Sequence, residues 1–280
     1  MPRSSEKKHW EEFWSSSPGL EDVYANDGRV VAFLAARIDL GGKRVLEVGA
    51  GTGRDSVELA ARGAEVWTLD YSEQALRIMR EASGADAGAR MGGDVCSPSL
   101  LDAKVACGEH TSPLGEIRIV SGDARALPFR DESFDIVFHQ GLLEHFRDPL
   151  SVLRENHRVL GRGGHLLVDV PQRYHYYTLV KHALMAVDKW FAGWETEFSA
   201  GELAALMREA GFDIEGAYGE NLFPPVWYRG VRRVALKAGI RLPMHPAPAL
   251  VRVRQAVRGS VPLRVRLATS MVIGCLGRKR

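Results

Sequence analysis

Hydrophobic residues along the chain fall into short, β-branched runs separated by stretches of helical periodicity. The runs predict strands, at residues 44–48, 65–69, 117–121, 135–139, 165–170, 212–218 and 271–276. The stretches between them predict helices, at residues 55–62, 72–82, 149–160 and 200–210. Strands that alternate with helices favour a doubly wound α/β fold. We therefore expect a mostly parallel, seven-stranded sheet with helices on both faces.

Capping residues support three of these helices. Ser72 stands just ahead of one helix, and Asp148 followed by Pro149 opens another, because Asp is a good cap and Pro suits a first turn. Ser199 and Glu202 have the spacing of a capping box. Local chemistry and periodicity thus predict the same starting points.

The stretch from 84 to 116 interrupts the alternation. It is rich in glycine and proline, at Gly84, Gly88, Gly92, Gly93, Pro98, Gly108, Pro113 and Gly115. This density is typical of loops. We predict a long loop insertion between the second helix and the third strand.

A glycine-rich turn joins the first strand to the first helix of the sheet. Glycines at Gly49, Gly51 and Gly53 let the backbone turn tightly and approach a ligand. The following helix N-terminus can receive an anionic group. The dinucleotide pattern G-x-G-x-x-G would place its third glycine where Arg54 stands, and Glu47 precedes the turn, so this spacing disfavours a nicotinamide site.

Acidic residues follow the next two strands. Asp70 ends a strand about twenty residues after the glycines, where a carboxylate can accept both ribose hydroxyls. Tyr71 can pack on an adenine face or cover the sheet edge. Asp123 can accept from the adenine amino group and the Ala124 N–H can reach a ring nitrogen, although a lone Asp after a strand is usually a turn residue.

Together with residues 134–146, these segments resemble the class I S-adenosylmethionine-dependent methyltransferases, in particular the type-11 group. The resemblance covers about residues 40–218 apart from the insertion. It implies a Rossmann-like fold, methyl transfer as the activity and S-adenosyl-L-methionine as the cofactor. The implied contacts are Glu47, Gly49, Gly51 and Gly53 around the methionine part, Asp70 at the ribose, Asp123 and Ala124 at the adenine, and Gln140 near the methionine end.

We predict three parts of the chain, of which the insertion at 84–116 and the basic C-terminal part depart from the usual pattern of the family. Residues 1–40 would form an N-terminal helical cap, closing over the site with Trp10, Trp14 or Tyr24. Residues 41–218 would form the methyltransferase domain, with the insertion at 84–116 and an aromatic lid at 171–198. Residues 219–280 would form a basic extension that completes the sheet.

A general base is needed only if the acceptor must lose a proton. His145, which follows the fourth strand, is the first candidate, and His139 and Glu144 are alternatives. A histidine that packs under the next helix would look the same in sequence. The predicted lid is rich in Tyr, Trp and Phe and offers His175 and Glu195 as polar groups, although an ordinary aromatic core would have this composition too.

Charge is unevenly distributed along the 280 residues. The formal net charge is +2, but residues 221–280 hold thirteen Lys and Arg and no Asp or Glu, which leaves −11 on the rest. Such asymmetry can mark an anionic partner. A basic amphipathic helix from Pro248 to before Gly259 would suit an anionic membrane surface, whereas basic helices packed on the acidic part would explain the charge equally.

Cysteine content and the N-terminus favour a cytoplasmic protein. The three cysteines are odd in number, and no apolar signal segment or stretch of about 20 apolar residues is present. Cys96, Cys107 and His110 lack the paired spacing of a zinc site, so we expect no metal.

The leading functional hypothesis is methyl transfer to a small-molecule acceptor, hydrophobic or anionic and lipid-like. A catalytically silent S-adenosylmethionine-binding scaffold or sensor has the same motifs. An aminopropyltransferase would need a doubly acidic substrate site, which is not seen after the fourth strand. Nucleic acid is a further alternative acceptor, but no recognition module stands out. The oligomeric state and the methylated atom are not indicated.

Overall fold

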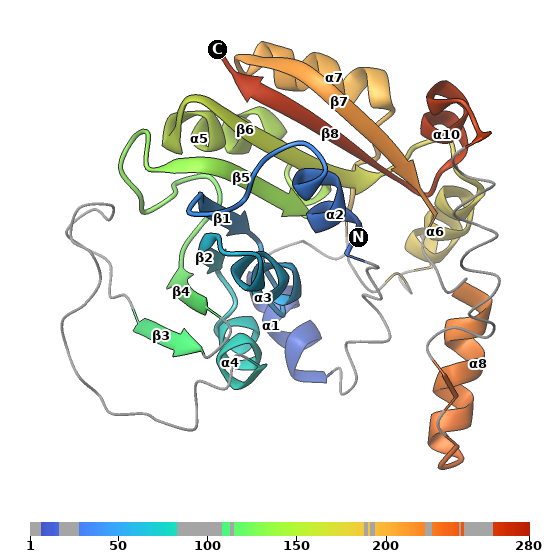
Figure 1. The fold of residues 1–280 in the computed structure, drawn as a ribbon. Coiled ribbons are helices and arrows are strands. Elements are labelled where there is room, and N and C mark those ends of the chain that lie inside the picture. The colour runs from blue at the N-terminus through green and yellow to red at the C-terminus, as the bar shows by residue number, and fades with distance from the viewer. Residues whose placement is uncertain are drawn as a thin grey trace.

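The computed structural model describes residues 7–16, 28–82, 108–112, 115–187, 190, 194–221, 226–240, 242–243 and 260–280. Its centre is one twisted sheet (Figure 1) with the strand order β3-β4-β2-β1-β5-β6-β8-β7. The strands are β1 (Arg44–Val48), β2 (Glu65–Asp70), β3 (Gly108–Ser112), β4 (Gly115–Ser121), β5 (Phe134–Gln140), β6 (Leu160–Pro171), β7 (Phe212–Glu220) and β8 (Val272–Lys279).

The sheet is mostly parallel, as predicted. Strands β4, β2, β1, β5 and β6 pair in parallel, while β8 runs antiparallel to both β6 and β7. All seven predicted strands are present. An eighth, β3, pairs antiparallel with β4 at the edge of the sheet. The prediction of a loop throughout 84–116 was therefore wrong at its end, where β3 and the start of β4 lie.

Helices cover both faces of the sheet. They are α1 (Lys7–Ser16), α2 (Arg29–Ala35), α3 (Arg54–Ala61), α4 (Glu73–Ala82), the 3-10 turn η3 (Leu143–His145), α5 (Pro149–Val159), α6 (Tyr176–Ala186), α7 (Ala200–Glu209), α8 (Val226–Lys237) and α10 (Leu263–Thr269). Helices α5 and α7 pack on one hydrophobic core, and α2, α3 and α4 on the other. The two cores are almost free of water contact and fix the sheet between them.

The predicted caps form. Asp148 accepts a hydrogen bond from the Ser151 N–H, and Pro149 stands in the first turn of α5. Ser199 and Glu202 form the complete capping box of α7. The hydroxyl of Ser72 accepts from the Ala75 N–H at the start of α4.

Some predicted features lie outside the described residues. They are Tyr24, Cys96, Cys107 and the helix from Pro248 to before Gly259. Within the described part, no helix has the length and apolar character needed to cross a membrane. The same part contains no group of three side chains suited to hold a metal ion.

Candidate active site

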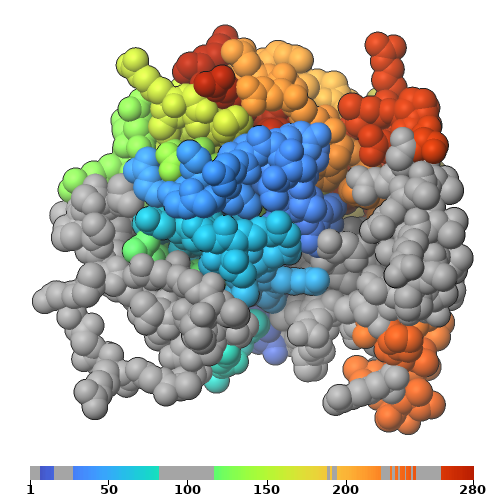
Figure 2. Space-filling view, in the orientation of Figure 1, coloured from blue at the N-terminus to red at the C-terminus, as the bar shows by residue number. Residues whose placement is uncertain are grey.

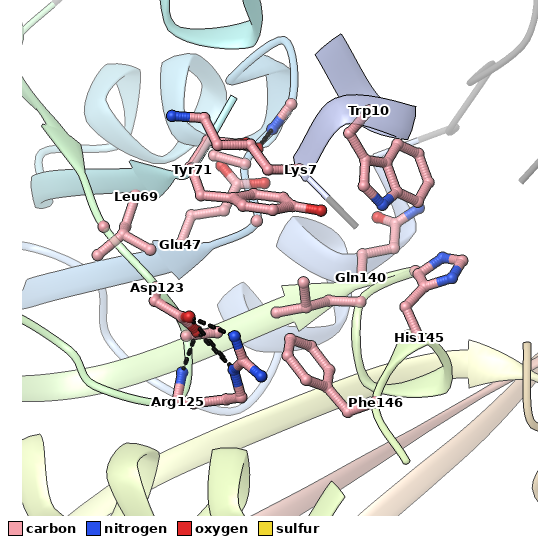
Figure 3. A pocket seen from close by; sticks show the side chains of 18 of the residues that line it. Lys7, Trp10, Glu47, Leu69, Tyr71, Asp123, Arg125, Gln140, His145 and Phe146 are labelled. Atoms are coloured by element: carbon pink, nitrogen blue, oxygen red, sulfur yellow. Dashed lines mark hydrogen bonds and ion pairs between the residues drawn. The ribbon is translucent and has the colours of Figure 1, made fainter. Parts of the chain in front are cut away.

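A cavity of about 940 Å³ opens where β1, β2, β4 and β5 end. From β1 the chain adds β2 and β4 on one side of β1 and then returns to add β5 on the other side. Ligands of open α/β sheets bind at the point where the strand order changes direction in this way. Most predicted site residues line the cavity: Trp10, Trp14, Glu47, Gly49, Gly51, Asp70, Tyr71, Asp123, Ala124, Gln140 and His145. Figure 3 shows Tyr71 and Asp123 on one side, with Trp10, Gln140 and His145 on the other.

The glycine turn adopts a backbone that other residues rarely adopt. Gly49 and Gly51 have φ of 68° and 55° and line the cavity. Gly53 also has positive φ but does not line it. A methyl group on Gly53 would lie 2.5 Å from Cγ of Met79 in α4. Packing of α3 against α4 thus explains glycine at residue 53, and its contact with a ligand stays a prediction.

Asp70 is buried at the end of β2 and organises the turn. Its Oδ2 accepts from the Gly51 N–H at 3.0 Å and its Oδ1 from the Ser72 N–H at 2.9 Å. Burial raises the pKa of Asp70 above its ordinary value, although these hydrogen bonds oppose the shift. A carboxylate oxygen can accept more than one hydrogen bond, so ligand hydroxyls can still bind Asp70 beside the N–H groups of Gly51, Tyr71 and Ser72.

Glu47 is the second buried carboxyl group of the cavity. The Ser56 hydroxyl of α3 donates to it. Burial and the neighbouring charge of Asp55 raise the pKa of Glu47 well above its ordinary value. The bottom of the cavity therefore holds a carboxyl group that favours its neutral form.

Asp123 is engaged by a residue that sequence reasoning did not anticipate. The Arg125 side chain donates to both its oxygens, at 2.7 Å from Nη2 to Oδ2 (Figure 3). Hydrogen bonds from Arg125 lower the pKa of Asp123. The carboxylate expected to meet an adenine amino group is thus held as an ion by its neighbour.

Helix α1 lies along one side of the cavity, which Lys7, Trp10 and Trp14 line. The Glu11 carboxylate accepts from the Glu73 and Gln74 N–H groups at 2.7 and 3.2 Å, which ties α1 to the N-terminus of α4. Trp14 lies over the glycine turn, where a methyl group on Gly51 would be 2.9 Å from its ring. Trp10 meets the ring of His145 edge-on at 4.9 Å.

His145 sits in η3 with its tautomer set by the backbone. Its Nδ1 lies 3.3 Å from the Trp194 carbonyl oxygen. A carbonyl only accepts, so Nδ1 carries the proton and Nε2 keeps its lone pair. Burial lowers the pKa of His145, so the ring is neutral at neutral pH.

The two alternative bases are placed elsewhere. His139 is fully buried in β5 and does not line the cavity. Burial lowers its pKa to about 3, so it stays neutral inside the protein. Glu144 is buried within η3 and does not line the cavity. Burial, together with the charge of Glu195, raises the pKa of Glu144 well above its ordinary value. The structure thus brings neither to the site.

The predicted aromatic lid divides into three environments. Trp194 lines the cavity. Trp190 and Phe198 are buried in the protein, whereas Tyr174 and Tyr176 are exposed on its surface. His175 caps α6 by accepting from the Tyr177 N–H. Most of these described aromatic residues therefore lie in the packed interior or on the surface and do not line the cavity.

A buried ion cluster holds this segment in place. Nζ of Lys181, in α6, lies 2.8 Å from Oε2 of Glu195 and 2.7 Å from Oε1 of Glu197. The Trp190 indole N–H donates to the other oxygen of Glu195. Burial lowers the pKa of Lys181, but the two carboxylates outweigh it and raise the pKa above its ordinary value. Glu195 is thus a structural anchor and does not line the cavity.

Several cavity residues were missed from sequence. They are Lys7, Arg54, Arg125, Phe146, Arg147 and Ser151. Arg54 opens α3 directly after the glycine turn, so its position at a helix N-terminus was a usable signal. Arg125 and the pair Phe146–Arg147 directly follow predicted site residues, which was also a usable signal, whereas Lys7 and Ser151 reach the cavity through the tertiary fold.

Comparison with known proteins gives a consistent result. Residues 46–168 match the family model of a methyltransferase domain. The ubiquinone biosynthesis O-methyltransferase of Neisseria meningitidis serogroup C is 26% identical over 75% of this chain and 80% of its own length. The demethylmenaquinone methyltransferase of Clavibacter sepedonicus is 33% identical over 49% of this chain and 45% of its own.

A solved structure has the same fold over nearly the whole chain. It is a methyltransferase of Thermotoga maritima, described as a possible histamine N-methyltransferase, with a TM-score of 0.59 and 19% identity over 98% of this chain and 99% of its own. The fold, the cavity and these matches define a class I methyltransferase. The protein is an S-adenosylmethionine-dependent methyltransferase, and its residues 46–168 match the family of methyltransferase domains.

Proposed function

We propose that the protein methylates a hydroxyl oxygen on a hydrophobic, ring-containing small molecule. The observation that carries this proposal is the neutral His145, whose Nδ1 proton is committed to the Trp194 carbonyl and whose Nε2 is left to accept a proton. Trp10 and Trp194 stand beside it as aromatic walls. The O-methyltransferase name of the Neisseria relative supports the same chemistry.

The cofactor fits the cavity through the chemistry of the groups present. Asp70 offers two acceptors to a ribose diol, while the turn at Gly49 and Gly51 gives the cofactor room near the N-terminus of α3. The Tyr71 ring can face the adenine, and Gln140 lies at the methionine end. When bound, S-adenosylmethionine supplies an electrophilic methyl group on sulfur.

The chain's own part in the reaction is to position the acceptor and to take a proton. The acceptor oxygen forms the new bond to carbon, its proton passes to Nε2 of His145, and the methyl–sulfur electron pair stays on sulfur. Correct positioning can supply about 7–11 kcal/mol of the barrier. Closure by α1 keeps Trp10 over the base.

The direct test is turnover with simple hydroxylated rings. Incubation with S-adenosylmethionine and catechol-type acceptors should give S-adenosylhomocysteine and an O-methylated ring, identified by mass spectrometry. Methylation of a matched aromatic amine should not depend on His145, because its nitrogen attacks through a free lone pair and needs no prior loss of a proton. Tight cofactor binding without product from any acceptor would identify a silent binding protein instead.

Removal of the Asp70 carboxylate should weaken cofactor binding. We expect Asp70→Ala to cost about 3 kcal/mol in S-adenosylmethionine affinity, the size of two charge-assisted hydrogen bonds. Calorimetry measures this directly. Asp39→Ala is a matched control, because Asp39 also accepts from the N–H two residues on, that of Gly41, but lies outside the cavity. Equal affinity of the two variants would remove Asp70 from the site.

We also propose that the protein works at an anionic membrane surface. The large apolar side chains that are well exposed in the described part gather in three segments: Tyr174, Tyr176, Leu179, Val180 and Val187 around α6, Val231, Val234, Leu236 and Ile240 around α8, and Leu263 and Val265 in α10. Figure 2 shows α8, in orange, at the lower right edge of the molecule. Residues 221–280, which include α8 and α10, contain no Asp or Glu. Exposed apolar residues in such a basic segment suit an anionic lipid surface.

Vesicle binding should depend on this apolar surface. The protein should co-sediment with vesicles containing anionic lipid at low salt, and less as salt rises. Leu179→Glu and Val234→Glu should each reduce binding, because a carboxylate is repelled by the surface and resists burial. Ala61→Glu, on the exposed side of α3, adds the same charge elsewhere and should bind normally. Protein that stays in the supernatant throughout would exclude a membrane role.

A further inference from the structure

One wall of the cavity carries aromatic rings and a cation together. Phe146 and Arg147 directly follow η3 and line the cavity together with Trp194. The Arg147 guanidinium carbon lies 4.7 Å from the Trp194 ring centroid, a cation–π arrangement. This wall adjoins His145, so an acceptor presented to the base lies beside it.

Arg147 keeps its hydrogen-bonding groups available. Within the described residues it has no ion pair or hydrogen bond, whereas Arg125 is bound to Asp123 on both oxygens. The neighbouring Asp148 keeps its negative charge, while its Oδ1 accepts from the Ser151 N–H to cap α5. The hydrogen-bond donors that stay available on this wall are therefore those of Arg147.

Stacking prepares this arginine for a ligand. A guanidinium on an aromatic face keeps its planar fork of N–H donors, which matches the two oxygens of a carboxylate or phosphate. The contact with Trp194 already restricts the rotamers of Arg147, so its side chain loses less conformational entropy when a ligand binds. Arg147 is exposed, so solvent will moderate the interaction.

We propose that the acceptor carries an oxyanion group, a carboxylate or a phosphate, that binds Arg147 while its hydroxyl meets His145. This inference rests on the proposed O-methylation and defines the substrate class more narrowly. The acceptor is then a hydroxylated ring with one anionic substituent. Aromatic walls hold the ring, Arg147 holds the anion, and the base selects the hydroxyl.

The test compares ring acceptors of equal shape. The probes are 3,4-dihydroxybenzoate, its neutral amide 3,4-dihydroxybenzamide, and 3,4-dihydroxyphenylphosphonate, each added to the protein saturated with S-adenosylhomocysteine. Binding is followed by calorimetry. We expect at least one anion to bind about tenfold more tightly than the amide, the size of one partly exposed charged contact. The stronger anion distinguishes carboxylate from phosphate recognition.

Substitutions assign the preference to one side chain. Arg147→Gln should abolish it, and Arg147→Lys should keep part of it, because charge remains while the fork is lost. Arg154→Gln is the matched control, since Arg154 is an exposed arginine of α5 outside the cavity. Equal binding of anion and amide, no binding of any probe at millimolar concentration, or a preference that survives Arg147→Gln overturns the inference. Anions that bind by Arg147 but are not methylated support it and count against O-methylation alone.

Discussion

Replacing Lys181 by methionine should destabilise the protein by about 3–5 kcal/mol, because it leaves two carboxylates buried without their cation. Lys181 is 2% exposed and lies within 2.8 Å of both Glu195 and Glu197. Urea unfolding, read as a shift of midpoint at constant slope, measures the effect. The loss should shrink as pH falls, because Lys181 helps to hold the pKa of Glu197 below its ordinary value and that stabilisation is lost once this carboxyl group is protonated.

Two further variants separate the buried charge from the lost side chain. Adding Glu195→Gln to Lys181→Met should recover part of the stability. Arg77→Met breaks the exposed ion pair with Glu81 in α4 and should cost less than about 1 kcal/mol. A Lys181→Met loss as small as that of Arg77→Met would mean that water reaches the cluster.

Replacing His145 by glutamine should lower turnover about 10²- to 10⁴-fold, the usual contribution of a general base. Glutamine can still donate to the Trp194 carbonyl, so the substitution removes the proton acceptor and keeps the local hydrogen bond. Cofactor affinity should stay close to that of the parent. Single-turnover kinetics on S-adenosylmethionine and a catechol acceptor measures the chemical step.

The pH profile gives an independent check on His145. Only the neutral ring accepts a proton, and burial lowers its pKa below the ordinary 6.5. The rate should therefore hold its plateau through pH 6.5 and fall only at lower pH. His165→Gln, on β6 and outside the cavity, should leave rate and profile unchanged. Unchanged turnover in His145→Gln would return this histidine to a packing role.

Local signals accounted for the framework of the site. The glycine turn, the carboxylate at the end of β2 and the caps of α5 and α7 each depend on residues close in sequence, so their spacing predicted them. The strands were predicted from runs of apolar residues, which are local too and which are buried in the structure.

Features that depend on distant partners were not predictable in this way. Strand β3 pairs with β4 at the edge of the sheet, whereas the glycine-rich stretch 84–116 that contains it suggested a loop. His139 and Gln140 are adjacent, but successive side chains of a strand point to opposite faces, so only Gln140 reaches the cavity. The Lys181 cluster and the Arg147 stack join residues 14 and 47 positions apart, which no local pattern reveals.

Trp14 gives residue 51 a reason to remain glycine that is separate from cofactor binding. Gly51 has φ of 55°, and a methyl group there would lie 2.9 Å from the Trp14 ring. The docking of α1 therefore requires glycine at this position whether or not a cofactor is bound. A descendant that lost methyl transfer but kept the N-terminal helix would still be under selection for glycine at residue 51. In such a lineage the conserved glycine would reflect the docking of α1. Loss of the Asp70 carboxylate would be the earlier sign that methyl transfer had been lost.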